Sequence, residues 1–181
     1  MRLTFASYNI HKAVGLDRKR DPERILSVLH EIDADIIALQ EADRRIGQRA
    51  SVLPRAEIDD TQWRVVEVAK RPRSIGWHGN ALLVRRDMDV LEGEALDLPT
   101  LEPRGAACGE LMVEGHRLRV IGTHLDLSGL RRRDQIRSLL VKSLLTVQPH
   151  LSHTYHALLG DDNPGFSCFE ILGFDVTLDR S

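Results

Sequence analysis

Residues 34–41 read ADIIALQE, and this stretch decides the fold. Ile36 to Leu39 is a short, continuous apolar run, the pattern of a strand that is buried on both faces. Residues 22–33 predict an amphipathic helix just before it, since an Asp-Pro pair can cap and begin a helix and apolar residues then repeat at helical spacing. Residues 3–8 predict a strand before that helix. Strand, helix and strand in succession predict a βαβ unit with two parallel strands.

Strand patterns dominate the middle of the chain, and one further helix and strand follow. We expect a tight hairpin at 114–116 and a helix at 135–145. A short helix is expected at 166–172, followed by a strand-like run. The expected strands are 63–69, 80–85, 106–113, 117–123 and 155–159. This order predicts an α/β fold, with residues 1–181 forming a single domain.

Composition excludes several classes of protein. The net charge of -2 gives no global positive field, which argues against a protein that coats DNA without specificity. The N-terminus shows no signal-peptide pattern, and no apolar run approaches the length of a transmembrane helix, so we expect a cytoplasmic protein. Cys108 and Cys168 are far apart and are expected to be buried, reduced thiols.

Polar side chains follow four of the expected buried strands at their carboxyl ends. In open α/β sheets this is the end at which ligands bind. One such residue alone is most often an ordinary loop residue, but four groups at equivalent positions indicate a shared site. The four groups are Asn9 with His11, Gln40 with Glu41, His124 with Asp126, and Asp161 with Asn163.

These residue types suit metal-assisted hydrolysis of a phosphoester. The carboxylate of Glu41 and the amide oxygen of Asn9 favour Mg²⁺ or Mn²⁺ over zinc. Such a metal polarises a phosphoryl oxygen and stabilises the leaving oxygen. Asp161 could orient or deprotonate a water and Asn163 could bind a phosphate oxygen, while His124 could protonate or stabilise the departing charge.

Six short strings, in order and at matching spacing over nearly the whole chain, resemble the endonuclease/exonuclease/phosphatase superfamily of metal-dependent phosphohydrolases, which includes deoxyribonuclease. The strings are SYNIH at 7–11, ADIIALQE at 34–41, GNALL at 79–83, GTHLD at 122–126, RDQ at 133–135 and GDDN at 160–163. The resemblance implies a four-layer α/β sandwich of two mixed β-sheets with helices outside. It also implies that Asn9 and Glu41 lie at the metal, His124 at the scissile phosphate, and Asp161 and Asn163 at the water and phosphate.

Five residues are candidates for binding the substrate: His11, Asn80, Arg104, Asp126 and Arg133. For His11 and Arg133 an exposed, solvated loop or turn is an equally ordinary interpretation. The substrate could be a nucleic acid, a phospholipid head group or an inositol phosphate, because neither the residues nor the resemblance distinguishes among these.

The chain departs from the family pattern in two places. Asp162 stands where the family has an aromatic residue, and nothing matches the family's terminal Ser-Asp-His strand. We therefore expect a domain that is incomplete at its C-terminus. Two alternatives to an active hydrolase follow: a catalytically impaired fragment that binds a metal or a partner, and a pure interaction module in which the polar clusters have no shared role.

Overall fold

The computed structural model describes residues 2–44, 47–98, 105–125, 129–145, 154–161 and 171–177. The βαβ unit predicted from residues 34–41 is present. Strands β1 (Arg2–Asn9) and β2 (Ile36–Gln40) run parallel as neighbours, and helix α1 (Pro22–Ile32) connects them. The α1 helix begins where predicted because the side chain of Asp21 accepts a hydrogen bond of 3.0 Å from the backbone N–H of Arg24.

The first sheet has five strands and is mixed. Strand β4 (Ala81–Arg85) is antiparallel to β2, and β3 (Trp63–Val65) is antiparallel to β4. On the other side, β9 (Ile171–Thr177) is antiparallel to β1, which gives the order β3-β4-β2-β1-β9. The short helix α2 (Arg55–Asp59) precedes β3, and a 3-10 turn η1 (His11–Ala13) follows β1.

The second sheet has four strands in the order β5-β6-β7-β8 and is also mixed. Strands β5 (Asp89–Asp97), β6 (Gly105–Val113) and β7 (His116–His124) are antiparallel neighbours, whereas β8 (Thr154–Asp161) runs parallel to β7. The predicted hairpin joins β6 to β7 through Glu114 and Gly115, both with positive φ, as a type I′ hairpin turn requires. Helix α3 (Gly129–Leu145) crosses from β7 to β8.

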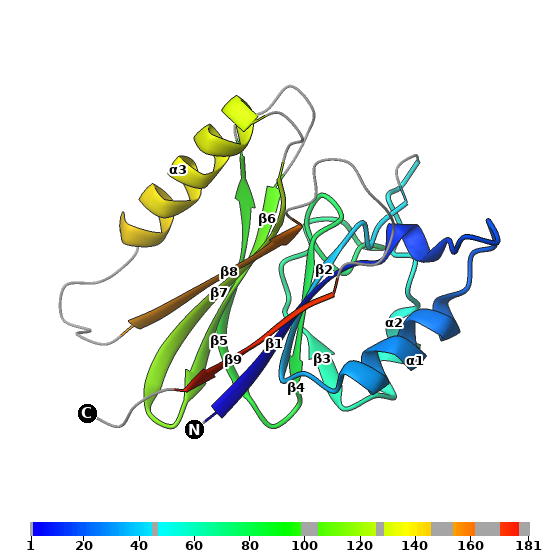
Figure 1. Ribbon diagram of the computed structural model, residues 1–181, viewed down its shortest axis with the longest axis horizontal. Helices are drawn as coiled ribbons and strands as arrows, with labels where there is room; N and C mark the ends of the chain where they lie inside the picture. Colours follow the sequence, from blue (N-terminus) through cyan, green and yellow to red (C-terminus); the bar gives the residue numbers. More distant parts are fainter. Residues whose placement is uncertain are drawn as a thin grey trace.

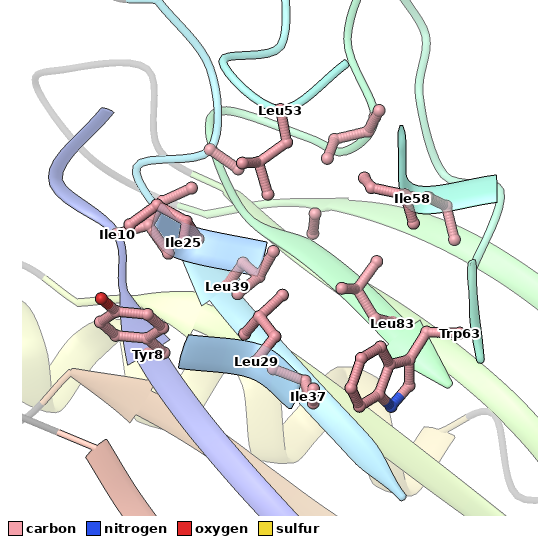
Figure 2. Close-up of a cluster of buried hydrophobic side chains, with 14 of the residues drawn as sticks. Tyr8, Ile10, Ile25, Leu29, Ile37, Leu39, Leu53, Ile58, Trp63 and Leu83 are labelled. Carbon is pink, nitrogen blue, oxygen red and sulfur yellow. The ribbon is translucent and has the colours of Figure 1, made fainter. Parts of the chain in front are cut away.

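The two sheets stack face to face, with α1 and α2 beside the first sheet and α3 beside the second (Figure 1). Three apolar clusters fill the spaces between these layers. One lies under α1 and α2 and includes Tyr8, Leu29, Leu39 and Trp63 (Figure 2). A second lies between the sheets, and a third lies under α3. The chain is thus a four-layer α/β sandwich, as the sequence predicted.

Several elements differ from their predictions. Helix α3 begins at Gly129 rather than at 135, and α2 and η1 were not predicted. The strand expected over 63–69 ends at Val65. Strand β5 was not predicted, because most of its side chains are exposed or half-buried and charged residues alternate with small ones. The helix expected at 166–172 is wrong at its last two residues, Ile171 and Leu172, which begin β9; pairing with β1 decides their conformation there. Among the described residues, no helix is both long and apolar enough to cross a membrane.

Candidate active site

The carboxyl ends of four strands meet at one edge of the sandwich. Asn9, at the end of β1, pairs with Gln40 at the end of β2, and His124, at the end of β7, pairs with Asp161 at the end of β8. A buried hydrogen-bond chain joins the two sheets just below this edge. The Oγ of Ser7 donates to the carbonyl oxygen of Gly160 at 3.1 Å.

The same Ser7 hydroxyl accepts a hydrogen bond of 3.1 Å from Nε2 of Gln40. Gln40 and Gly160 directly precede Glu41 and Asp161 along the chain, so the backbones of these two predicted site residues lie at the same edge. The spatial arrangement expected from the sequence is therefore present at the level of the backbone. Ser7 was not singled out from the sequence, since a serine within a strand gives no signal of a link between sheets.

Glu41 is the half-buried carboxylate at this edge, with 22% of its side chain exposed. The ammonium group of Lys12 contacts the Glu41 carboxylate. Burial raises the pKa of Glu41, but the hydrogen bond and charge of Lys12, with smaller contributions from His11 and His124, outweigh it and hold the pKa below its usual value. Glu41 is therefore ionised at neutral pH, and His11 and His124 lie close enough to it to influence its pKa.

Asn9 and the two histidines lie around this carboxylate. The Oδ1 of Asn9 accepts a hydrogen bond of 3.0 Å from the backbone N–H of His11, which fixes the direction of the Asn9 amide. His11 and His124 are half-buried. One carboxylate, one amide oxygen and two imidazoles therefore occupy the edge formed by β1, β2 and β7.

The backbone around Glu41 is strained. His11, Lys12 and Ala13 have φ between 50° and 59°, Glu41 has φ 55° and His78 has φ 50°. Residues other than glycine rarely adopt this left-handed backbone conformation, and such strain concentrates at functional sites. Hydrogen bonds hold these segments together: the N–H of Lys12 donates to the carbonyl oxygen of Glu41 at 3.2 Å, and that of Ala42 to the carbonyl oxygen of Gly79 at 2.9 Å.

Asn80 is buried below the edge at which the strands end, with 1% of its surface accessible. Its amide nitrogen donates to the carbonyl oxygen of Gly105 at 2.9 Å, and Thr123 Oγ1 donates to the same oxygen at 3.4 Å. Asn80 therefore ties the start of β4 in the first sheet to the start of β6 in the second. Its predicted contact with the substrate stays a prediction.

Two residues beside Glu41 were missed by sequence reasoning. Lys12 directly follows His11, and this adjacency was the one available signal. Asp43 lies two residues after Glu41 and is buried, and its Oδ2 accepts a hydrogen bond of 2.6 Å from Ser74 Oγ. Burial raises the pKa of Asp43, and this effect outweighs the hydrogen bonds from Ser74 and Gly79.

The remaining predicted site residues stand as follows. Arg133 is exposed on α3. Asp161 is described through its backbone alone. Arg104, Asp126 and Asn163 lie outside the described residues.

The fold is similar to solved structures of known proteins. TDP2 from Caenorhabditis elegans superposes with a TM-score of 0.59 at 18% identity, over 82% of this chain and 45% of that chain. The catalytic domain of human nocturnin with a bound sulfate anion superposes with a TM-score of 0.63 at 16% identity, over 88% of this chain and 64% of that one. TDP2 from Danio rerio, in complex with a single-strand DNA product, superposes with a TM-score of 0.63 at 17% identity, over 88% of this chain and 60% of that chain.

A short stretch of sequence is similar to proteins of a different kind. It is 44% identical over 45 residues to the tubulin polyglutamylase ttll6 of Danio rerio, and 45% identical over 47 residues to the human tubulin polyglutamylase TTLL7. Each match covers 25% of this chain, and 6% and 5% of those proteins respectively. Similarity over so small a part does not show membership of that group.

The model of the endonuclease/exonuclease/phosphatase family matches residues 6–154. This range includes Asn9, His11, Lys12, Glu41 and His124, and it ends before Asp161 and Asn163. The match covers most of the chain and agrees with the four-layer fold, so the chain belongs to the endonuclease/exonuclease/phosphatase family.

Proposed function

We propose that this chain is a phosphodiesterase that depends on a divalent metal, with its active centre at Glu41, Asn9, His11 and His124. The observation that carries the proposal is the ionised, half-buried carboxylate of Glu41, with two histidines acting on it at the edge where β1, β2 and β7 end. Family membership supports the general class of phosphoester hydrolase or nuclease.

The residues present fit Mg²⁺ or Mn²⁺ as the metal. Within the described ranges, no group of three or more acidic, histidine or cysteine side chains is arranged to hold a metal ion. Mg²⁺ does not need such a group, since it keeps several waters and binds through one or two carboxylates together with substrate phosphates. Glu41 supplies the carboxylate and Asn9 an amide oxygen. Bound there, the metal would polarise a phosphoryl oxygen and stabilise the leaving oxygen.

The side chains of this chain supply the proton transfers and the orientation of the substrate. His124 is placed to donate a proton to the departing oxygen or to stabilise its charge, and His11 to hold a phosphate oxygen. Asp161 is proposed to orient the attacking water, since its backbone pairs with that of His124. Asn163, Arg104 and Arg133 are proposed to bind phosphate oxygens, and Asp126 and Asn80 to contact other groups of the substrate.

Two proteins of similar structure contain a bound nucleic acid or a bound anion. TDP2 from Danio rerio binds a single-strand DNA product, and human nocturnin binds a sulfate, an anion similar to phosphate. These bound molecules support a phosphodiester substrate and favour a nucleic acid over the phospholipid and inositol alternatives.

Turnover of a dinucleoside monophosphate, whose alkoxide leaving group needs a proton, tests the proposal when it is measured in Mn²⁺, Mg²⁺ or EDTA. We expect hydrolysis that requires the metal and that falls by about 10²–10⁴-fold in His124→Gln, because a general acid contributes a factor of that size. His116→Gln is the matched control, since His116 lies at the other end of the same strand. Hydrolysis that persists in EDTA, or an equal loss in the two variants, would contradict the proposal.

A further inference from the structure

Positive charge is concentrated in two stretches of this chain, whose net charge is -2. No acidic residue lies between Asp43 and Glu57, and none lies between Glu67 and Asp87. Basic residues are frequent in both stretches. They are Arg44, Arg45, Arg49 and Arg55 in the first, and Lys70, Arg71, Arg73, Arg85 and Arg86 in the second. A protein without a global positive field therefore carries a local one.

The fold brings these two stretches together beside Glu41. The N–H of Ser51 donates to the carbonyl oxygen of Arg73 at 2.7 Å, and Nη1 of Arg49 donates to Nδ1 of His78 at 3.1 Å. Gly79 follows His78, and a Cβ on Gly79 would lie 3.6 Å from the Cα of Glu41. We call the resulting surface the basic flank; it comprises Arg44, Arg49, Lys70, Arg71 and Arg73.

The charge of the basic flank is only partly balanced. Arg44, Arg71 and Arg73 form no ion pair with any residue that the structure describes, and Lys70 lies 3.9 Å from the exposed carboxylate of Asp97. Burial lowers the pKa of His78, and the charges of Arg49, Arg71 and Lys70 lower it further, beyond the opposing effect of Asp97. These cations lie close enough to His78 to disfavour its protonation. A bound anion would offset their positive potential.

An aromatic ring lies within the flank. Trp77 is half-buried, and the Nζ of Lys70 lies 4.5 Å from the centroid of its ring. Cations combined with an aromatic side chain are typical of surfaces that bind single-stranded nucleic acid. A lipid surface would instead require exposed apolar anchors. The large apolar side chains that are exposed in the described part of the chain lie elsewhere: Leu16, Leu91, Leu130, Val141 and Leu158.

We propose that the basic flank binds the phosphates of a single-stranded oligonucleotide that lie next to the one at Glu41. The substrate is then a polynucleotide chain rather than an isolated phosphodiester. The position of the scissile phosphate rests on the proposed function, whereas binding of the chain by the flank does not. Arg44, Lys70 and Arg73 are exposed and placed to contact the neighbouring phosphates, and Arg49 and Arg71 are half-buried.

Fluorescence anisotropy of a labelled oligothymidylate, measured in EDTA, tests the binding without catalysis. The test variant is Arg44→Gln/Lys70→Gln/Arg73→Gln, and the control with the same change in charge is Arg86→Gln/Arg117→Gln/Arg137→Gln, from outside the flank. We expect the test variant to bind at least about tenfold more weakly. The slope of log affinity against log salt should decrease in magnitude by about 2, because each of the three lost phosphate contacts contributes about 0.7. The control should stay within about twofold of wild type.

The second readout is turnover of bis(p-nitrophenyl) phosphate, which has a single phosphate and should be unchanged in the test variant. No turnover in any protein, together with the expected loss of binding, would refute the proposed function and leave the flank as a binding surface. No binding by wild type, or equal weakening in both variants, would overturn the proposal. Loss of binding to vesicles that contain a phosphoinositide, with oligonucleotide binding unchanged, would also overturn it in favour of a lipid.

Discussion

The ammonium group of Lys12 contacts the carboxylate of Glu41, although 29 residues separate the two in the chain. Glu41 lies directly after β2, Lys12 lies in the η1 turn that follows β1, and both have positive φ. The contact places a fixed cation at the carboxylate proposed to hold the metal. The Lys12 ammonium group and the proposed metal therefore compete for the Glu41 carboxylate, and this competition can be measured.

Lys12→Met should increase the affinity for the metal. Without the ammonium group, Glu41 is released from an ion pair that contributes about 1 kcal/mol at such a half-exposed position. The concentration of Mg²⁺ that gives half of the maximal thermal stabilisation should fall by about fivefold. Lys19→Met, in the exposed loop that follows η1, should leave this concentration unchanged. A higher concentration in Lys12→Met would instead assign Lys12 a supporting role in the metal site.

The Lys12–Glu41 pair also predicts how stability depends on pH in the absence of metal. The folded-state pKa of Glu41 lies below its usual value, so its contribution is complete above the unfolded pKa of about 4.3 and is lost as the pH falls through the folded pKa. In EDTA, wild type should melt above Glu41→Gln at about pH 6. The difference should shrink steadily towards about pH 3. A difference that stays constant or grows on acidification would show that the ion pair contributes nothing.

Gly105→Ala should destabilise the fold and displace Trp77. A Cβ at Gly105 would lie 2.4 Å from Cδ1 of Trp77 and 2.8 Å from the carbonyl oxygen of Leu96, and the latter is backbone and cannot turn aside. Overpacking of this kind costs about 1–3 kcal/mol, which denaturant unfolding can measure. Gly109→Ala, in the same strand, meets the side chains of Val66 at 3.3 Å and Leu82 at 3.6 Å, and no backbone atom among its nearest contacts, so it should cost less. An equal loss in the two variants would contradict this assignment.

Cys108 should be unreactive while the protein is folded. Its side chain is buried, and burial raises the pKa of the thiol to about 11, so almost no thiolate forms near neutral pH. Iodoacetamide at about pH 8 should label Cys108 only after unfolding, as peptide mass spectrometry can show. Labelling of the native protein at the rate of an exposed thiol would show that the β6 strand opens.

The sequence predicted the parts of the fold that depend on local patterns. The apolar run at Ile36 to Leu39 and the Asp21 cap were sufficient for the βαβ unit, and both are present as expected. Strand β5 was missed because most of its side chains are exposed or half-buried, so buried apolar residues do not alternate with exposed polar ones along it. Leu172 was assigned to a helix because pairing across more than a hundred residues leaves no local signal.

Local sequence patterns also predicted which strand ends carry the polar residues of the candidate site. Polar residues at the carboxyl ends of buried strands converge once the strands are parallel, and the strand ends that carry Asn9, Glu41 and His124 lie at one edge. The roles of these residues stay predictions. Contacts made by long side chains across that edge could not be predicted. The approach of Lys12 to Glu41 and that of Arg49 to His78 depend on positive-φ turns, which these residue types do not signal.

Thermal unfolding with and without Mg²⁺ tests the central claim most directly, that Glu41 holds a divalent metal. A ligand at about 100 times its Kd stabilises the folded state by about 2.7 kcal/mol, so the Tm of wild type should rise by about 5–10 °C. Glu41→Gln should show no rise, while Glu31→Gln, an exposed change on α1, should respond as wild type does. An equal rise in Glu41→Gln and wild type, or no rise in either, would contradict the account.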